Sequence, residues 1–262
     1  MIIVWGTKIK RTQLGVVGDF CPICRDFQQC SLTRITSHGH IYFLSFGSGT
    51  VRGYERTCEN CGQVLLADLN HYAMVADRSE SNVAELVRTT NPRGAERHAR
   101  RLAVEQRVRQ RQLSAEERME AIREPFLLVN PTYEARRRNV NFDLHSALGF
   151  WATILVPAAI LIGASVVSGH IAKPVLYTAM GLGGAAFLFT LCSVVSDCRR
   201  FSTRVLYPRL IRSLHPLQPT LEELWEVQNG LKSLGVATRK LNISDLHEQL
   251  LFREQFGIRE AA

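Results

Sequence analysis

Two short stretches decide how this chain folds: Cys21-Pro-Ile-Cys24 and Cys58-Glu-Asn-Cys61-Gly62. In each stretch two residues separate a pair of cysteines, so both thiols can face one ion from a single tight turn. Pro22 pre-sets φ and Gly62 accepts a positive φ, which suits such turns. Four thiolates complete the tetrahedral shell that zinc prefers. The spacing therefore predicts one structural zinc ion, with these ligands: Cys21, Cys24, Cys58 and Cys61.

The 33 residues between the two cysteine pairs are predicted to be β-structure. Strand-forming residues dominate four stretches, at about 13–20, 29–36, 40–46 and 51–57. A chain that leaves a metal ion must return to it, so we expect a hairpin here. We place its turn at Ser37–Gly39 and treat residues 47–50 as a bulge or loop in the returning arm.

With these strands, residues 1–66 resemble a zinc ribbon: strand, Cys-Pro-x-Cys, β-hairpin, Cys-x-x-Cys-Gly. The resemblance covers about a quarter of the chain. It implies a scaffold that presents a strand face to protein or nucleic acid, and the long hairpin departs from the usual pattern. Taken with two apolar segments in the second half, the chain is similar to a family of membrane-anchored zinc-ribbon proteins without assigned activity.

Other titratable residues of this region are given ordinary roles. Cys30 lies six residues after Cys24, off the ligand spacing, and is interpreted as a strand residue; His38 and His40 are interpreted as loop residues. A dithiol oxidoreductase is an alternative use of one cysteine pair. Its chemistry favours a thiol of lowered pKa at a helix N-terminus. The residues that follow Cys24 show no helical pattern, which weakens that alternative.

Two apolar runs dominate the second half of the chain. Residues 144–172 and 174–196 contain no Asp, Glu, Lys or Arg. A hydrocarbon core needs about 20 apolar helical residues, so we predict a two-helix transmembrane hairpin with spans at 146–168 and 174–196. Two buried helices of a soluble core are the alternative, because such helices can also be apolar all round.

Basic residues flank the two runs unevenly, which predicts an orientation. The connecting loop offers only Lys173, whereas the outer flanks carry eight arginines: Arg136, Arg137, Arg138, Arg199, Arg200, Arg204, Arg209 and Arg212. By the positive-inside rule both termini are expected in the cytoplasm. Thiols stay reduced there, which favours metal binding over disulfides.

An arginine-rich helix is predicted at Gly94–Gln112, after a short helix at Ser81–Thr90 that ends before Pro92. A third helix opens at Ser114 with a capping box and is expected to end before Pro125. The net charge of the whole chain is +8, which favours anionic neighbours. The predicted anion-binding residues are Arg97, Arg100, Arg101, Arg107, Arg109 and Arg111. Lipid is the favoured anionic neighbour for the charge of the whole chain. For the helix itself, a solvated face, a partner helix, lipid and nucleic acid all stay open, and nucleic acid is less favoured because the helix lacks aromatic residues for base stacking.

The last 66 residues, 197–262, are predicted to form a helical tail. Residues 199–214 are expected along the membrane surface. A capping box at Thr220 opens a helix that ends at Gly235, and a final helix is expected at Ser244–Phe256.

The predicted fold class is therefore multi-domain. Its parts are a small β zinc ribbon (1–77), a basic helical linker (78–128), a juxtamembrane segment (129–145), the transmembrane hairpin and the helical tail. No catalytic residues are predicted, since the sequence holds no phosphate loop, nucleophile elbow or paired carboxylates. The expected function is a non-catalytic, membrane-anchored interaction protein with a protein partner or a second copy of itself. A membrane-tethered nucleic-acid-binding ribbon comes next, then the oxidoreductase.

Overall fold

The computed structural model describes residues 5–41, 44–78, 82–138, 144–168 and 173–256. The chain forms two compact units. Unit 1 combines Met1–Val129 with Pro208–Ala262, and unit 2 is Asn130–Tyr207. The strands are β1 (Trp5–Cys21), β2 (Asp26–Ile41), β3 (Leu44–Cys58) and β4 (Val64–Ala67). The helices of unit 1 include α1 (Val83–Thr90), α2 (Gly94–Arg97), α3 (Ala99–Gln110), α7 (Tyr207–Leu214), α8 (Leu221–Ser233) and α9 (Ile243–Phe256), with α7 beginning at the boundary.

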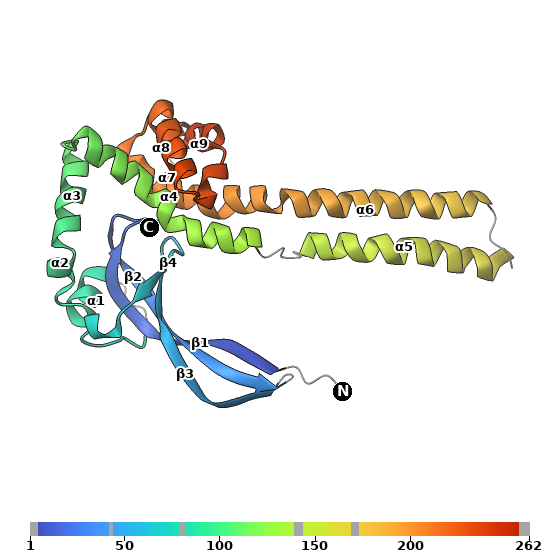
Figure 1. The fold of residues 1–262 in the computed structure, drawn as a ribbon, viewed down its shortest axis with the longest axis horizontal. Coiled ribbons are helices and arrows are strands. Elements are labelled where there is room, and N and C mark those ends of the chain that lie inside the picture. The colour runs from blue at the N-terminus through green and yellow to red at the C-terminus, as the bar shows by residue number, and fades with distance from the viewer. Residues whose placement is uncertain (1–4, 42–43, 79–81, 139–143, 169–172, 257–262) are drawn as a thin grey trace. The chain divides into compact units, whose positions relative to one another are not determined.

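The four strands of the described chain form one antiparallel sheet in the order β1-β2-β3-β4 (Figure 1). The hairpin turn predicted at Ser37–Gly39 is wrong, because these residues continue β2 and pair with Ile9, Lys8 and Thr7 of β1. Pairing with the long first strand satisfies their backbone groups, which a local turn signal cannot reveal. The irregularity predicted at 47–50 is confirmed, since the register shifts there between β2 and β3.

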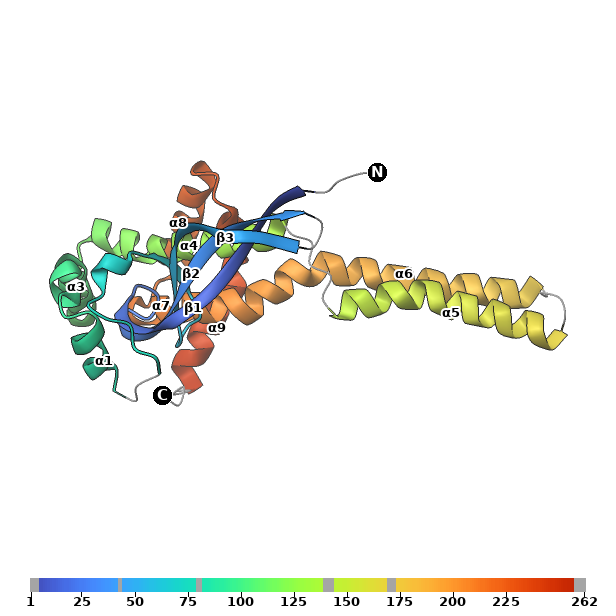
Figure 2. The same ribbon diagram turned by 90° about the horizontal axis from the view of Figure 1, so that it is seen from below.

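The inner half of the sheet packs on α1. Gly18 lies so close to this helix that a Cβ atom there would approach the Val87 backbone to 2.7 Å. The Gly18 amide donates to Thr90 Oγ1 at 2.9 Å, and Leu86 of α1 is fully buried. The outer halves of β1, β2 and β3 project away from the helices of unit 1 (Figures 1 and 2). The core therefore lies at the cysteine end of the sheet.

Helix α4 (Ala115–Arg138) begins as predicted but does not end at Pro125. Ser114 and Glu117 form the expected reciprocal cap, with bonds of 3.2 Å in both directions. A proline inside a helix costs about 3 kcal/mol. The helix continues because the turns around it bury Ile122 and Phe126 completely, and burial of two such side chains offsets that cost.

The predicted arginine-rich helix is divided in two, because His98 lies between the end of α2 at Arg97 and the start of α3 at Ala99. In the tail the predicted capping box is present: Thr220 accepts from the Glu223 amide and Glu223 accepts from the Thr220 amide. Helix α8 ends at Ser233, two residues before the predicted Gly235, whose φ is +70°. Helix α9 follows close to its predicted bounds. Arg118 of α4 binds Glu223 through two hydrogen bonds, which joins the tail to the rest of unit 1.

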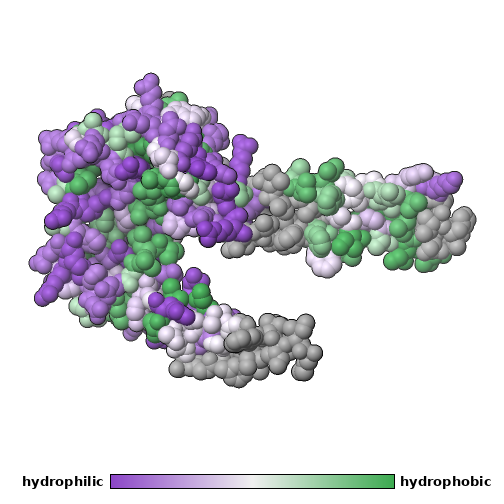
Figure 3. Space-filling view, in the orientation of Figure 1, coloured by the Kyte–Doolittle hydropathy of each residue, from purple (hydrophilic) through white to green (hydrophobic). Residues whose placement is uncertain are grey.

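Unit 2 is built on two long antiparallel helices, α5 (Leu144–Ser168) and α6 (Lys173–Phe201), which pack against each other. A Cβ atom on Gly183 would lie 2.8 Å from Pro157 Cγ, so the helices approach closely at this point. Near the C-terminal end of α6, Asp197 accepts two hydrogen bonds, of 2.8 and 2.6 Å, from Arg136 in the last turn of α4. Large apolar side chains remain exposed on the pair, among them Trp151 and Phe189. Figure 3 shows hydrophobic residues at intervals along it.

The predicted transmembrane hairpin is not supported by the structure. No helix among the described residues is long and apolar enough to cross a membrane. The prediction used charge-free length, which does not separate a spanning helix from one that packs on a neighbouring helix. The two-helix transmembrane hairpin of the fold class and the two-pass location with cytoplasmic termini are therefore wrong. Of the predicted connecting loop, residues 169–173, Lys173 begins α6 and residues 169–172 lie outside the described residues.

Candidate metal centre

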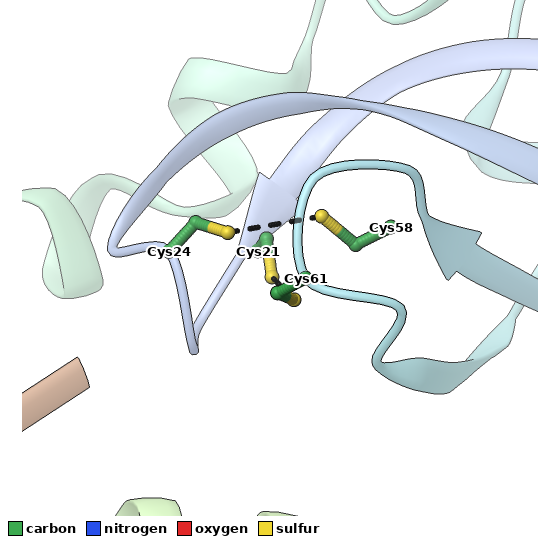
Figure 4. Close-up of side chains that lie close together, drawn as sticks. All are labelled: Cys21, Cys24, Cys58 and Cys61. Carbon is green, nitrogen blue, oxygen red and sulfur yellow. Dashed lines mark hydrogen bonds between the residues drawn. The ribbon is translucent and has the colours of Figure 1, made fainter. Parts of the chain in front are cut away.

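The four predicted ligands lie together in unit 1. The sulfur atoms of Cys21, Cys24, Cys58 and Cys61 all lie within 4.8 Å of one another (Figure 4). Cys21 Sγ is 3.6 Å from Cys61 Sγ, and Cys24 Sγ is 3.8 Å from Cys58 Sγ. Zinc–thiolate bonds of about 2.3 Å place the sulfurs of a tetrahedron about 3.8 Å apart, whereas a disulfide requires about 2.05 Å. The four sulfurs therefore have the spacing of a zinc-ribbon-like site and could hold a metal ion such as zinc.

Two tight turns position the four sulfurs. Cys21 ends β1 and Cys58 ends β3, while Cys24 and Cys61 lie in the turns that follow. In the second turn the Gly62 amide donates to the Cys58 carbonyl at 2.8 Å, and φ of Gly62 is +69°. The first turn closes at Arg25, which takes the same left-handed conformation with a φ of +56°. We call the turns 21–25 and 58–62 the first and second knuckle.

The cluster is largely shielded from solvent, which shapes its electrostatics. Cys21 and Cys58 are buried, with 0% and 1% of their surface exposed, and Cys24 and Cys61 are half-buried. Hydrogen bonds from the neighbouring thiols, Cys21 first, hold the pKa of Cys58 far below its usual range. Hydrogen bonds from Cys21 and Cys24 also lower the pKa of Cys61. Hydrogen bonds among the four thiols therefore favour thiolate, the form that binds metal, within the cluster.

The remaining cysteines lie outside the four-sulfur cluster. Cys30 is buried and pairs with Cys58 across β2 and β3, and its sulfur lies 3.7 Å from the Gln28 carbonyl. Cys192 and Cys198 belong to α6 of unit 2. His38 lies in β2, where its Nε2 is 3.0 Å from Thr36 Oγ1, and is not a loop residue.

The first knuckle is anchored by the buried Arg25, whose role the sequence did not indicate. Its Nε donates to the Ser213 carbonyl of α7 at 2.7 Å. Its two terminal nitrogens donate to Glu105 of α3 at 2.9 Å and to the Ala121 carbonyl of α4 at 3.2 Å. One side chain thus ties the knuckle to three helices. The residues concerned lie 80 to 188 positions away, and no local pattern identifies such a contact.

The second knuckle is bound by two arginines of α7. Arg209 donates to the Gly62 carbonyl at 2.9 Å and to Gln63 Oε1 at 3.4 Å. Arg212 donates to the backbone and side-chain oxygens of Asn60, both at 2.7 Å. The sequence offered these arginines only as membrane-flanking charges. In the structure they bind α7 to the second knuckle, while the bond from Arg25 to the Ser213 carbonyl ties the same helix to the first.

A second buried polar cluster surrounds Asp19 of β1, which is 2% exposed. Its carboxylate is paired with Arg56, accepts from Tyr72 Oη at 2.7 Å and lies 3.2 Å from His98 Nε2. Asn91 Nδ2 donates to it at 3.2 Å. The cluster joins the sheet to α1 and to the junction of α2 and α3, and gives the buried carboxylate the partners that it needs.

The arginines predicted to bind anions are mostly engaged within unit 1. Arg101 pairs with Glu105 and Glu124, and Arg107 with Glu117 at 2.7 Å. Arg97 donates to the His71 carbonyl at 2.9 Å, and Arg111 donates to Gln218 at 3.2 Å. Arg100 and Arg109 are exposed and, among the described residues, make no side-chain hydrogen bond or ion pair. The structure therefore does not gather the six guanidinium groups into one site.

This arrangement of four thiols can bind a metal ion and hold the ends of β1 and β3 together. Comparison with known proteins adds no family to this result: no protein-family model matches the chain, and neither a curated protein nor a solved structure is detectably similar to it.

Proposed function

We propose that this chain is a non-catalytic interaction protein whose four-cysteine cluster holds one structural zinc ion. The observation that carries the proposal is the tetrahedral spacing of the four sulfurs, two of which are fully buried. Structural zinc sites use four protein ligands, whereas catalytic sites keep one position open for water or substrate. Four thiolates fill the shell, so the ion would stabilise the fold and leave no position for a substrate.

The metal content of the purified protein tests this proposal. Under reducing conditions we expect about one zinc ion per chain by mass spectrometry of the metals, since four thiolates form one shell. Cys58→Ser should remove most of the zinc. Cys192→Ser is the matched control, because this exposed cysteine lies outside the cluster. Folded wild-type protein that lacks metal and carries a Cys21–Cys24 disulfide would instead favour the dithiol oxidoreductase.

A nucleic-acid-binding role is the second candidate, and the outer halves of β1 and β3 favour it. Lys8, Lys10 and Arg52 are exposed there, on strand halves that extend away from the helices of unit 1 in Figure 1. The nearest carboxylate along these strands, Glu55, is paired with Arg11. An exposed basic surface is the electrostatic requirement for contact with phosphates. Nucleic acid is therefore the second candidate partner for the proposed interaction role, and its binding can be measured directly.

Salt-dependent binding of a labelled DNA duplex tests the second candidate. We expect the double variant Lys8→Glu, Lys10→Glu to weaken binding and to reduce the slope of log K against log salt by about 0.9 for each phosphate that is no longer bound. The matched control is the double variant Arg100→Glu, Arg109→Glu. It changes the net charge by the same amount, at two exposed positions of α3. Equal weakening in both variants would indicate a response to net charge alone. Capture of a protein from a native extract, with no DNA binding, would favour a protein partner.

A further inference from the structure

Helix α7 contacts both halves of the candidate metal centre at once. Arg25 of the first knuckle donates to the Ser213 carbonyl of α7, and Arg209 of α7 donates to the Gly62 carbonyl of the second knuckle. Arg212 adds two bonds of 2.7 Å to Asn60. These bonds can form together only when the two knuckles keep a fixed separation. A metal ion bound by cysteines of both knuckles would impose that separation.

The charges of the centre point to Arg209 in particular. Four thiolates and one Zn²⁺ carry a net charge of −2. Arg25 is already neutralised by Glu105. Arg209 is half-buried, and among the described residues it makes no ion pair with a carboxylate. Its positive charge is therefore stabilised by the thiolate cluster, and the cluster by it.

We propose that α7 is an outer shell of the zinc site, and that zinc binding and the docking of α7 are thermodynamically linked through Arg209. This inference rests on the proposed zinc site and adds to it a segment that responds to metal occupancy. The linkage is reciprocal: α7 raises the affinity for zinc by the same factor by which zinc favours the docked helix. When zinc leaves and the four thiolates take up protons, the cluster loses its net charge of −2 and the knuckles are no longer held at a fixed separation, so α7 leaves them.

Zinc affinity is the first test, measured by competition with a chromophoric chelator. Outer-shell partners of metal ligands change metal affinity by about 10- to 100-fold, so Arg209→Gln should weaken zinc binding at least tenfold. Arg209→Lys keeps the charge and should retain most of the affinity. Arg100→Gln is the control, because this arginine is exposed on α3 and far along the chain from the knuckles. An unchanged affinity in Arg209→Gln would overturn the proposal.

Hydrogen exchange of residues 208–214 is the second test, with and without excess chelator. We expect removal of zinc to raise exchange in α7 more than in α1, which packs on β1 and β2. Unchanged exchange in α7 after confirmed loss of zinc would contradict the linkage. If exchange rises throughout unit 1, the zinc affinities of the Arg209 variants decide: weaker binding in Arg209→Gln supports the linkage, and unchanged binding overturns it. A purified wild-type protein that never holds zinc would overturn the proposed function itself, which separates the two failures.

Discussion

At the scale of single residues, the metal centre depends on backbone conformations that few side chains tolerate. Gly62 follows the fourth cysteine with a φ of +69°, in the left-handed region where a Cβ atom is strained. A Cβ atom there would also lie 3.0 Å from Arg209 Nη2. Gly62 therefore serves both the turn that places Cys61 and the contact between the second knuckle and α7.

Gly62→Ala tests this dual role. We expect a loss of about 1–2 kcal/mol in the free energy of unfolding, because an L-residue must take the left-handed conformation, with a further cost if Arg209 is displaced. Chemical denaturation of the zinc-loaded protein measures it. Gly39→Ala is the control, since a Cβ atom there would have no other atom within 4 Å and the φ of Gly39 is not positive. Equal stability of the two variants would contradict the argument.

His98 gives the buried cluster around Asp19 a pH dependence. Burial, together with the charges of Arg56, Arg97 and His71, lowers the pKa of His98 below its usual value, although Asp19 Oδ1 lies 3.2 Å from its Nε2. A histidine whose pKa is lower in the folded state binds fewer protons there than in the unfolded chain. Its contribution to stability is therefore present above about pH 6.5 and lost as the pH falls through its folded pKa.

The stability of the wild type should accordingly decline as the pH falls below about 6.5, and His98→Gln should flatten that decline. Denaturation at a series of pH values measures both curves. His247→Gln is the control, because the histidine lies in α9, away from Asp19. A decline of the same size in wild type and His98→Gln would assign the pH dependence to other groups.

At the scale of secondary-structure elements, local sequence propensity and tertiary packing favour different structures at two places, and packing determines which one forms. Residues 115–138 contain two prolines and still form one helix, because Ile122, Phe126 and Val129 are fully buried on it. Ser37–Gly39 has turn composition and still forms a strand, because β1 supplies a partner for each residue. In the α5–α6 pair, small residues permit the close approach of two helices.

Gly183→Leu should loosen the α5–α6 pair. A Cβ atom at this position would lie 2.8 Å from Pro157 Cγ, and overpacking of this kind costs about 1–3 kcal/mol. We expect faster proteolysis and faster hydrogen exchange in both helices. Gly184→Leu is the matched control, because no atom lies within 4 Å of its Cβ position. Equal effects of the two substitutions would exclude packing against Pro157 as the cause.

At the scale of the whole molecule, the two units should respond differently to removal of metal. The four cysteines lie in unit 1, where they join β1 to β3 and contact α7, whereas unit 2 contributes no residue to the cluster. Binding of a metal to the folded state alone stabilises the unit that binds it. Unit 1 should therefore become less stable when the metal is removed, and unit 2 should not.

Calorimetry with and without a chelator measures this difference. We expect the transition of unit 1 to move to lower temperature on chelation, and the transition of unit 2, identified by its shift in Gly183→Leu, to stay in place. A shift of both transitions by the same amount would show that the units unfold as one.

The sequence by itself determined the four clustered cysteines, the caps at Ser114 and Thr220, and the approximate position of most helices, because these features depend on residues a few positions apart. It could not determine which apolar helices pack on each other, since charge-free length is shared by membrane-spanning and paired helices. The predicted membrane topology is wrong, so it no longer supports a reducing compartment. Metal binding is favoured over disulfides by the distances of 3.6 and 3.8 Å between sulfur atoms. Only the tertiary structure placed Arg25, Arg209 and Arg212 on the knuckles. Contacts across 147 to 188 residues depend on how the whole chain closes, and no local pattern records them.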